Sequence, residues 1–145
     1  MHADKKLRII VFDDDPGITT LLKTMISGMG HNVLTFPDPT ACAVYKKPDC
    51  ECPQEFPCAD VVIADVMMPH VSGIDLFKLL RKRGCKALDA NKAFMSAAIT
   101  DEQKKAVEEL HCHFFKKPFK LYEVKQWIDD CAARVPEGRI LAKLG

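Results

Sequence analysis

The sequence lacks any apolar run that approaches the roughly 20 residues of a membrane-spanning helix. It also lacks an excess of either charge, because 21 basic side chains face 20 acidic ones and the net charge is +1. This balance gives no electrostatic reason to expect nucleic acid or an anionic membrane as a partner. The apolar stretch near the N-terminus, residues 7–12, is too short for a signal peptide and carries Arg8. We therefore expect a cytoplasmic protein with no nucleic-acid and no membrane partner.

Internal repeats and a second domain are absent as well, and 145 residues are typical of a single domain. The seven cysteines are an odd number and too few for a disulfide scaffold, so free thiols are expected. Three of them, Cys85, Cys112 and Cys131, are expected to be small core residues. The five histidines show no metal-ligand spacing, and we expect each to be exposed and inert.

Short apolar runs alternate with helical patterns along the chain. Asp15 followed by Pro16 is a typical helix start, and Gly30 ends that helix. Thr100 and Gln103 form a capping box. Strands are expected at residues 7–12, 31–36, 61–64, 92–97 and 113–116, and helices at 16–29, 39–45, 73–83, 100–110 and 120–134. This alternation predicts an α/β fold, a doubly wound five-stranded parallel sheet of five βα units with helices on both faces.

Polar residues gather where the predicted strands end. Asp13 and Asp14 follow the first strand, Asp65 ends the third, Ser96 ends the fourth and Lys117 follows the fifth. Ligands of such sheets bind beyond the carboxyl ends of the strands. A carboxylate such as Asp65, at the end of an apolar run, is costly to bury without a partner. We therefore expect these five side chains to form one site.

The residue types of this site suit phosphoryl transfer. Three carboxylates at one edge repel one another unless a cation lies among them, and Mg²⁺ prefers oxygen ligands. Lys117 supplies a point positive charge and Ser96 a hydroxyl donor, which suit a transferred phosphoryl group. Asp65 is then the nucleophile that forms an aspartyl-phosphate.

Four stretches, "IIVFDDDPG", "DVVIADVMMPHVSG", "FMSAA" and "FFKKPF", resemble the response-regulator receiver domain of two-component signalling. The resemblance covers roughly residues 7–134 and implies a CheY-like, flavodoxin-like fold. Each stretch is a weak signal alone, but four in the family's order are a strong one. It implies that Asp13 and Asp14 are the metal-binding acidic pair. It also implies that Asp65 is the phosphoacceptor and a metal ligand, and that the backbone carbonyl of Met67 is the third protein ligand of the metal.

The same resemblance assigns the remaining positions. Ser96 matches the switch hydroxyl, Phe114 the switch aromatic and Lys117 the family's lysine, with a cis peptide bond before Pro118. Asp15 lies where the family often has an acid, and it is not assigned to the metal.

The function implied is that of a stand-alone receiver, because no DNA-binding or enzymatic output domain follows residue 136. A histidine kinase or histidine phosphotransfer protein would phosphorylate Asp65 in a Mg²⁺-dependent reaction. The phosphoryl group would draw Ser96 inward and Phe114 after it, changing the surface of the fourth helix, fifth strand and fifth helix for an unknown downstream protein. Such a chain is a signalling switch rather than an enzyme in the usual sense, since it catalyses only its own phosphorylation and dephosphorylation.

Two other functions remain open. A phosphohydrolase with an aspartate nucleophile, as in the haloacid-dehalogenase family, needs a second aspartate two positions on, where this chain has Met67. A pseudo-receiver that serves only as an interaction module would not need the complete set of phosphorylation residues. Phe114 also fits an ordinary core position, since it lacks a hydroxyl.

The segment 46–60 is longer than the usual receiver connection and contains Cys50, Cys52 and Cys58, with Cys42 nearby. A zinc site, a redox-sensitive pair and an inert insertion are the alternatives, and we favour the last because paired C-x-x-C spacing is absent. The segment enters the sheet from its amino end, so it should be dispensable for phosphotransfer. We expect the receiver domain to span 7–135, after a flexible stretch at 1–6. The tail 136–145 is either a docking peptide or, as we favour, a disordered end.

Overall fold

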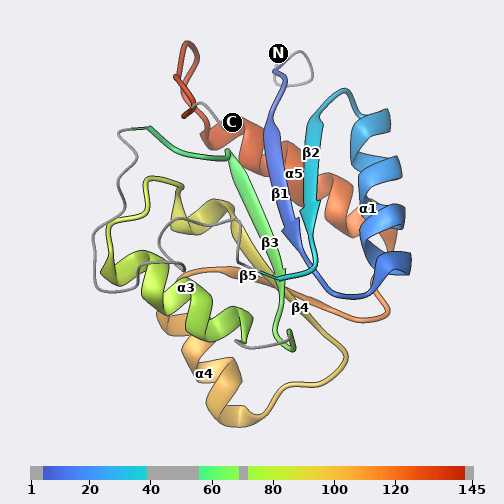
Figure 1. Ribbon diagram of the computed structural model, residues 1–145, viewed down its shortest axis with the longest axis vertical. Coiled ribbons are helices and arrows are strands. Elements are labelled where there is room, and N and C mark those ends of the chain that lie inside the picture. The colour runs from blue at the N-terminus through green and yellow to red at the C-terminus, as the bar shows by residue number, and fades with distance from the viewer. Residues whose placement is uncertain (1–4, 39–55, 69–71, 143–145) are drawn as a thin grey trace.

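The computed structural model describes residues 5–38, 56–68 and 72–142, and its centre is a five-stranded parallel sheet (Figure 1). The strand order is β2-β1-β3-β4-β5. The strands are β1 (Arg8–Phe12), β2 (Asn32–Phe36), β3 (Val61–Asp65), β4 (Lys92–Ser96) and β5 (His113–Lys116). The predicted doubly wound parallel sheet of the flavodoxin-like type is therefore confirmed.

The strand register brings the carboxyl ends of the strands to one edge. Phe12 pairs with Phe36 across β1 and β2, and Asp65 pairs with Met95 across β3 and β4. Ser96 pairs with Lys116 across β4 and β5. The order in which strands are added to the sheet reverses at β1, because β2 lies on one side of β1 and β3 lies on the other. Ligands bind at this switch point in sheets of this kind.

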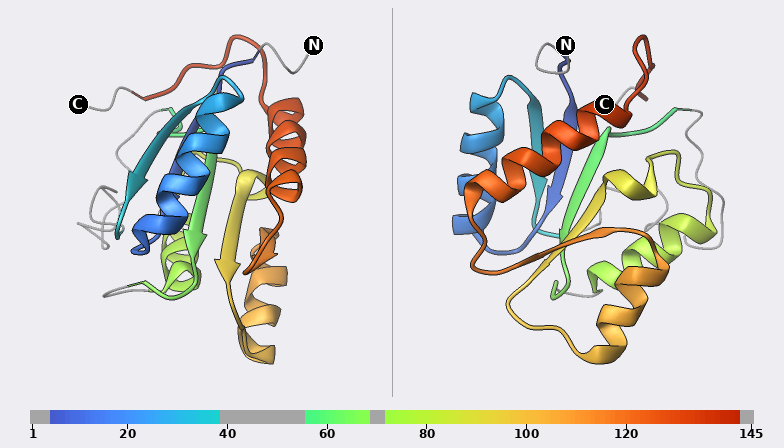
Figure 2. Two further views of the ribbon diagram at one scale, coloured as in Figure 1. Left: turned by 90° about the vertical axis from the view of Figure 1, so that its right-hand side faces the viewer. Right: turned by 180° about the vertical axis from the view of Figure 1, so that it is seen from behind.

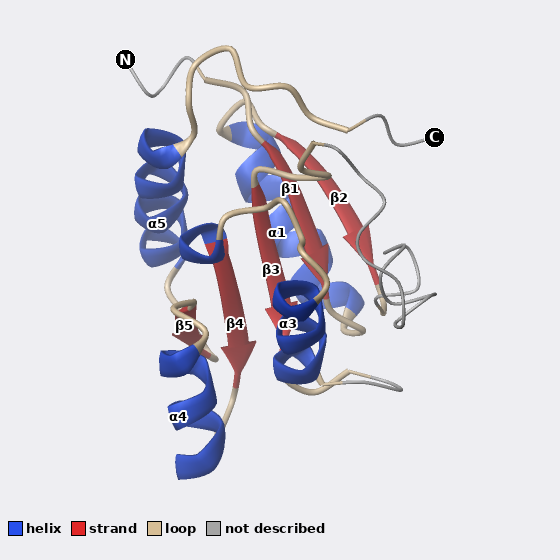
Figure 3. Ribbon diagram, turned by 90° about the vertical axis from the view of Figure 1, so that its left-hand side faces the viewer, coloured by secondary structure: helices blue, strands red, loops and turns tan. Residues whose placement is uncertain are grey.

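Helices cover both faces of the sheet (Figures 2 and 3). They are α1 (Pro16–Gly28), α3 (Gly73–Lys82), α4 (Asp101–Glu109) and α5 (Leu121–Arg134), and a 3-10 turn, η3 (Asp89–Asn91), precedes β4. The helix predicted at 39–45 lies outside the described residues. Among the helices of the described part, none has the length and apolar character that crossing a membrane requires.

Two apolar cores lie on opposite sides of the sheet. One joins α1 and α5 to the sheet and contains Leu22, Ile26 and Ile128, all fully buried. The other joins α3 and α4 to the sheet and contains Leu76, Phe77 and Val107. Every residue of β3 is buried, because this central strand is covered on both faces.

The helix starts agree with the capping signals in the sequence. The Asp15 carboxylate accepts a hydrogen bond from the backbone N–H of Gly17 at 2.8 Å and caps α1. Thr100 and Gln103 form the expected reciprocal capping box at the start of α4. These local bonds orient the two helices that begin just after β1 and β4.

Two expectations are corrected by the structure. His31 is buried rather than exposed, and its Nδ1 accepts a hydrogen bond from the backbone N–H of Leu7 at 3.1 Å. The tail beyond Pro136 is not a disordered end as far as residue 142, because Arg139 and Ala142 make hydrogen bonds to the body of the domain. The burial of His31 and the attachment of the tail were not predicted because their hydrogen-bond partners are distant in the sequence.

The cysteines follow the prediction in part. Cys131 is buried in the core, whereas Cys85 and Cys112 are only half-buried at its edge. Burial raises the pKa of the Cys112 and Cys131 thiols to about 12, so both stay protonated at neutral pH. Cys58 precedes β3, while Cys42, Cys50 and Cys52 lie outside the described residues, as do His2 and His70.

Candidate functional site

Three carboxylates meet at the carboxyl edge of the sheet. Oxygen atoms of Asp13, Asp14 and Asp65 lie within 4.8 Å of one another. Asp13 and Asp65 are buried, and Asp14 is exposed at the opening of the cluster. The sequence-based grouping of these three acids therefore corresponds to one place in the structure.

Asp13 is the most buried acid of the cluster, with 1% of its surface exposed. Its backbone N–H donates to the carbonyl of Phe36 at 3.0 Å, and its Oδ1 accepts from the N–H of Asp15 at 2.9 Å. Burial raises the pKa of the Asp13 carboxyl, although the hydrogen bonds from Asp15 and Lys117 oppose this change. A nearby cation would stabilise the charged form of such a group.

Asp65 ends β3 and is held by its own loop. Its Oδ1 accepts a hydrogen bond from the backbone N–H of Met67 at 3.2 Å. The chain then turns back so that the N–H of Gly73 donates to the carbonyl of Val66 at 3.0 Å. A Cβ atom at position 73 would lie 2.4 Å from the carbonyl oxygen of Asp65. Only glycine permits this approach of α3 to the end of β3.

Lys117 supplies the positive charge of the site. Its Nζ lies 3.0 Å from Asp13 Oδ2 and 3.1 Å from Asp65 Oδ2. Burial alone would lower the pKa of this ammonium, but the hydrogen bonds to Asp13 and Asp65 outweigh it and raise the pKa overall. The peptide bond to Pro118 is cis, as the resemblance implied. The lysine is thus charged and placed between two carboxylates.

Ser96 lies at the same edge of the sheet, but its hydroxyl bonds to the loop between β4 and α4 rather than to the acidic cluster. It is buried, and its Oγ donates a hydrogen bond to the carbonyl of Ala98 at 2.7 Å. The same oxygen accepts from the N–H of Ala98 at 3.3 Å. Its backbone carbonyl accepts from the N–H of Lys117 at 2.8 Å, which ties the ends of β4 and β5 together. The hydroxyl therefore holds the start of the loop that leads to α4.

Phe114 is half-buried against the core between α3, α4 and the sheet. It lines a groove of about 590 Å³ together with Ala98, Ile99 and Val107. The groove thus connects the loop held by Ser96 with α4 and β5. Met67, the other position implied by the resemblance, has a side chain at the surface with 68% of the residue exposed.

The donor set fits a hard divalent cation. Three carboxylates face a single ammonium in the described part of the cluster, which leaves an excess of negative charge and several free oxygen lone pairs. Oxygen ligands of this kind, with room for water at the exposed Asp14, are what Mg²⁺ prefers. The carboxylates of Asp13, Asp14 and Asp65 are the groups that could hold it, and the Met67 carbonyl remains a ligand implied by the sequence resemblance alone.

Sequence reasoning missed two parts of this geometry. The requirement for Gly73 has a sequence signal, since this glycine closes the stretch "DVVIADVMMPHVSG". The pairing of Ser96 with Ala98 has none, because Ala98 contributes only backbone atoms.

Comparison with known proteins agrees with the fold. Residues 9–129 match the response regulator receiver domain family. The two-component response regulator ARR11 of Arabidopsis thaliana is 31% identical over 120 residues, which are 82% of this chain and 21% of that protein. The alkaline phosphatase synthesis transcriptional regulatory protein PhoP of Bacillus subtilis is 34% identical over 76 residues, 52% of this chain and 28% of that protein. The chain therefore matches only 21% and 28% of the lengths of these two relatives.

Solved structures share the fold. The receiver domain of the Francisella response regulator 1452 superposes with a TM-score of 0.70 at 24% identity, covering 89% of this chain and 98% of that one. The receiver domain of the sensor histidine kinase PA1611 from Pseudomonas aeruginosa has a TM-score of 0.67 at 15% identity, covering 89% and 99%. That structure has a magnesium ion coordinated in its active site cleft. With its fold, its acidic cluster and this match over most of its length, the chain belongs to the response regulator receiver domain family.

Proposed function

We propose that this receiver is a switch that is phosphorylated on Asp65 in a Mg²⁺-dependent reaction. The observation that carries the proposal is the position of the Lys117 ammonium, which lies within hydrogen-bond distance of both Asp65 and Asp13. These two carboxylates form one cluster with Asp14. Positioning and charge neutralisation are the main requirements of phosphoryl transfer, and this arrangement supplies both. The cytoplasmic location expected from the sequence is part of the same proposal.

The donor is a phosphohistidine of a histidine kinase or a histidine phosphotransfer protein. A carboxylate oxygen of Asp65 attacks the phosphorus, a P–O bond forms, and the P–N bond to the donor imidazole breaks. Lys117 then pairs with an oxygen of the transferred group, and the N–H of Met67 lies within reach of the Asp65 carboxylate. A bound Mg²⁺ would supply further charge neutralisation for the carboxylates and the phosphoryl oxygens.

The response to phosphorylation begins at Ser96. The new phosphoryl oxygens compete for the Ser96 hydroxyl, which now donates to the carbonyl of Ala98. Loss of that bond frees the loop to α4, and Phe114 can move into the groove that this loop lines. The surface formed by α4, β5 and α5 changes as a result, and a downstream protein that binds only one form reads the change.

Asp65 should accept one phosphoryl group when the protein is incubated with acetyl phosphate and Mg²⁺, as measured by intact-protein mass spectrometry. The increment should be absent in Asp65→Asn and present in Asp75→Asn, which removes an exposed carboxylate on α3. No uptake by the wild type would favour a pseudo-receiver. Repeated turnover of varied phosphomonoesters would favour a phosphohydrolase.

A further inference from the structure

The chain after α5 crosses the amino edge of the sheet, opposite the acidic site. In Figure 1 the strands point downward, while the segment that follows α5 lies at the top. A turn in which the N–H of Arg139 donates to the carbonyl of Pro136 at 3.3 Å redirects the chain, with Gly138 at a φ of 76°. The segment 136–142 then runs past the starts of β1 and β3.

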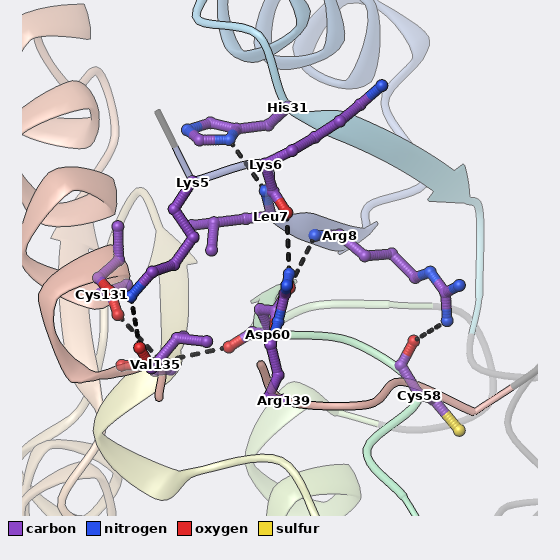
Figure 4. Close-up of polar contacts among 12 residues, drawn as sticks. Lys5, Lys6, Leu7, Arg8, His31, Cys58, Asp60, Cys131, Val135 and Arg139 are labelled. Atoms are coloured by element: carbon purple, nitrogen blue, oxygen red, sulfur yellow. Dashed lines mark hydrogen bonds and ion pairs between the residues drawn. The ribbon is translucent and has the colours of Figure 1, made fainter. Parts of the chain in front are cut away.

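Arg139 and Asp60 form the first attachment of this segment (Figure 4). Arg139 Nε donates to Asp60 Oδ1 at 2.9 Å, and Arg139 Nη2 donates to Asp60 Oδ2 at 2.6 Å. Asp60 is only 6% exposed, and the N–H of Arg8 donates to the same carboxylate at 2.9 Å. A buried carboxylate that accepts a bidentate guanidinium is strongly dependent on its partner.

Arg8 forms the second attachment. Its Nη1 donates to the carbonyl of Ala142 at 2.7 Å and to the carbonyl of Cys58 at 3.0 Å. The N–H of Ala142 in turn donates to the carbonyl of Pro57 at 2.8 Å, and Ala142 is buried. Two arginines therefore attach the segment at two points: Arg139 of the segment bonds to Asp60, and Arg8 of β1 bonds to Ala142.

The end of α5 belongs to the same network. Lys5 Nζ donates to the carbonyls of Ala132 and Val135 (Figure 4). Asn91 Nδ2 bonds to the carbonyls of Asp60 and Cys131, at 3.2 and 3.4 Å. The last turn of α5 is thus connected through Asn91 and Asp60 to Arg139.

We propose that residues 136–142 are an intramolecular clasp, an arginine-bearing segment that docks on Asp60 and Arg8 and holds the C-terminal half of α5 against the sheet. When the clasp is docked, the end of α5 is fixed relative to β1 and β3. When it is released, that end of α5 moves more freely. The clasp would also tune the surface formed by α4, β5 and α5, a consequence that rests on the proposed function.

Hydrogen exchange of the unphosphorylated 145-residue chain tests the clasp. Arg139→Ala should accelerate exchange in the last two turns of α5 by at least about tenfold. In this variant, local opening of that end of α5 no longer requires the Arg139–Asp60 hydrogen bonds to break. Asp60→Asn should accelerate the same amides. Arg139→Lys should give a smaller effect, because lysine keeps the charge but loses the bidentate fork. Glu137→Ala, a change of an exposed charge in the same segment, should leave these amides unaltered.

The pattern of exchange separates a clasp from a general stabilising contact. Amides of α1 and α3 should keep their protection in both Arg139→Ala and Arg139→Lys, while the end of α5 loses protection strongly in the first variant and less in the second. Equal acceleration in all helices would show a contribution to global stability only, and no acceleration in α5 would show that nothing is held. Either result overturns the proposal. Because no phosphoryl group is involved, neither result bears on the role of Asp65.

Discussion

Lys117 Nζ lies 3.1 Å from Asp65 Oδ2, although Lys117 follows β5, Asp65 ends β3, and β4 lies between these two strands. The contact is possible because the parallel strands end at the same edge and because the lysine side chain is long enough to span the end of β4. Asp13, from the strand on the other side of Asp65, accepts from the same ammonium. One cation therefore links the ends of three strands that are separate in the sequence.

Lys117→Ala should slow phosphorylation by acetyl phosphate at least about tenfold, which corresponds to the loss of roughly 1.4 kcal/mol of transition-state stabilisation. Mg²⁺ affinity should be largely retained, because an ammonium cannot ligate a metal. Lys116→Ala is the matched control, since that neighbouring lysine is exposed. Rates equal to the wild type in Lys117→Ala, together with unchanged partner binding, would exclude this role.

Asp14→Ala should weaken Mg²⁺ binding by about tenfold or more, because it removes one of the few protein oxygens available to the ion. Asp15→Ala should leave Mg²⁺ affinity close to that of the wild type, although loss of the α1 cap should cost about 1 kcal/mol of stability. NMR titration with Mg²⁺ measures the affinity of each variant. Equal affinities for the two variants would remove Asp14 from the metal site.

The aspartyl-phosphate should be comparatively long-lived. The N–H of Met67 contacts the Asp65 carboxylate and Ala98 contacts the Ser96 hydroxyl, so we expect these two positions to flank the approach of the hydrolytic water. Neither side chain orients a water, since a thioether is a weak acceptor and a methyl is none. The double variant Met67→Asn, Ala98→Glu should speed the decay by roughly tenfold. The decay of the phosphoprotein after removal of the donor is the measurement. Ala97→Glu, at an exposed neighbouring position, should decay like the wild type; an unchanged rate in the double variant would show that these positions do not set the lifetime.

Gly73→Ala should destabilise the fold by on the order of 1–3 kcal/mol, because the new Cβ would lie 2.4 Å from the backbone oxygen of Asp65. Gly28→Ala in α1 provides the contrast. Nothing lies within 4 Å of a Cβ at that position, so the change should stabilise the helix by up to about 1 kcal/mol. Urea denaturation of the two variants measures both effects, and similar midpoints would contradict the close approach of α3 to β3.

Stability should fall on acidification through His31. Burial lowers the pKa of this imidazole below 6.5, although the carboxylates of Asp129 and Asp60 oppose the change. The unfolded chain therefore binds the proton first as pH falls, so the stabilisation is complete above about 6.5 and is lost as pH drops toward the folded pKa. Protonation also removes the acceptor that Leu7 N–H uses.

Denaturant unfolding at a series of pH values tests this prediction. The free energy of unfolding of His31→Gln should depend less on pH between about 7 and 5 than that of the wild type. His111→Asn, which replaces an exposed histidine with a residue that tolerates its positive φ, should keep the wild-type dependence. Identical pH slopes for wild type and His31→Gln would show that the buried imidazole does not titrate with unfolding.

The sequence alone determined the order and type of the described strands and α-helices, because each depends on local periodicity and capping, whereas the 3-10 turn η3 was not predicted. The alternation of apolar strands with capped helices needs only neighbours within a few residues, as at Asp15 and Thr100. It also determined which end of the sheet carries the acids, since Asp13 and Asp65 directly follow apolar runs. Parallel strands then bring these ends together without further information.

Only the tertiary structure decided how the polar groups are paired. The N–H of Leu7 bonds to His31, which is 24 residues away, and Arg139 bonds to Asp60, which is 79 residues away. No local pattern marks a partner at such a distance, so His31 was expected to be exposed, and a disordered end was favoured over a docking peptide for the tail 136–145. Burial settles these cases, because a polar group removed from water has to find its partner in whatever the fold places beside it.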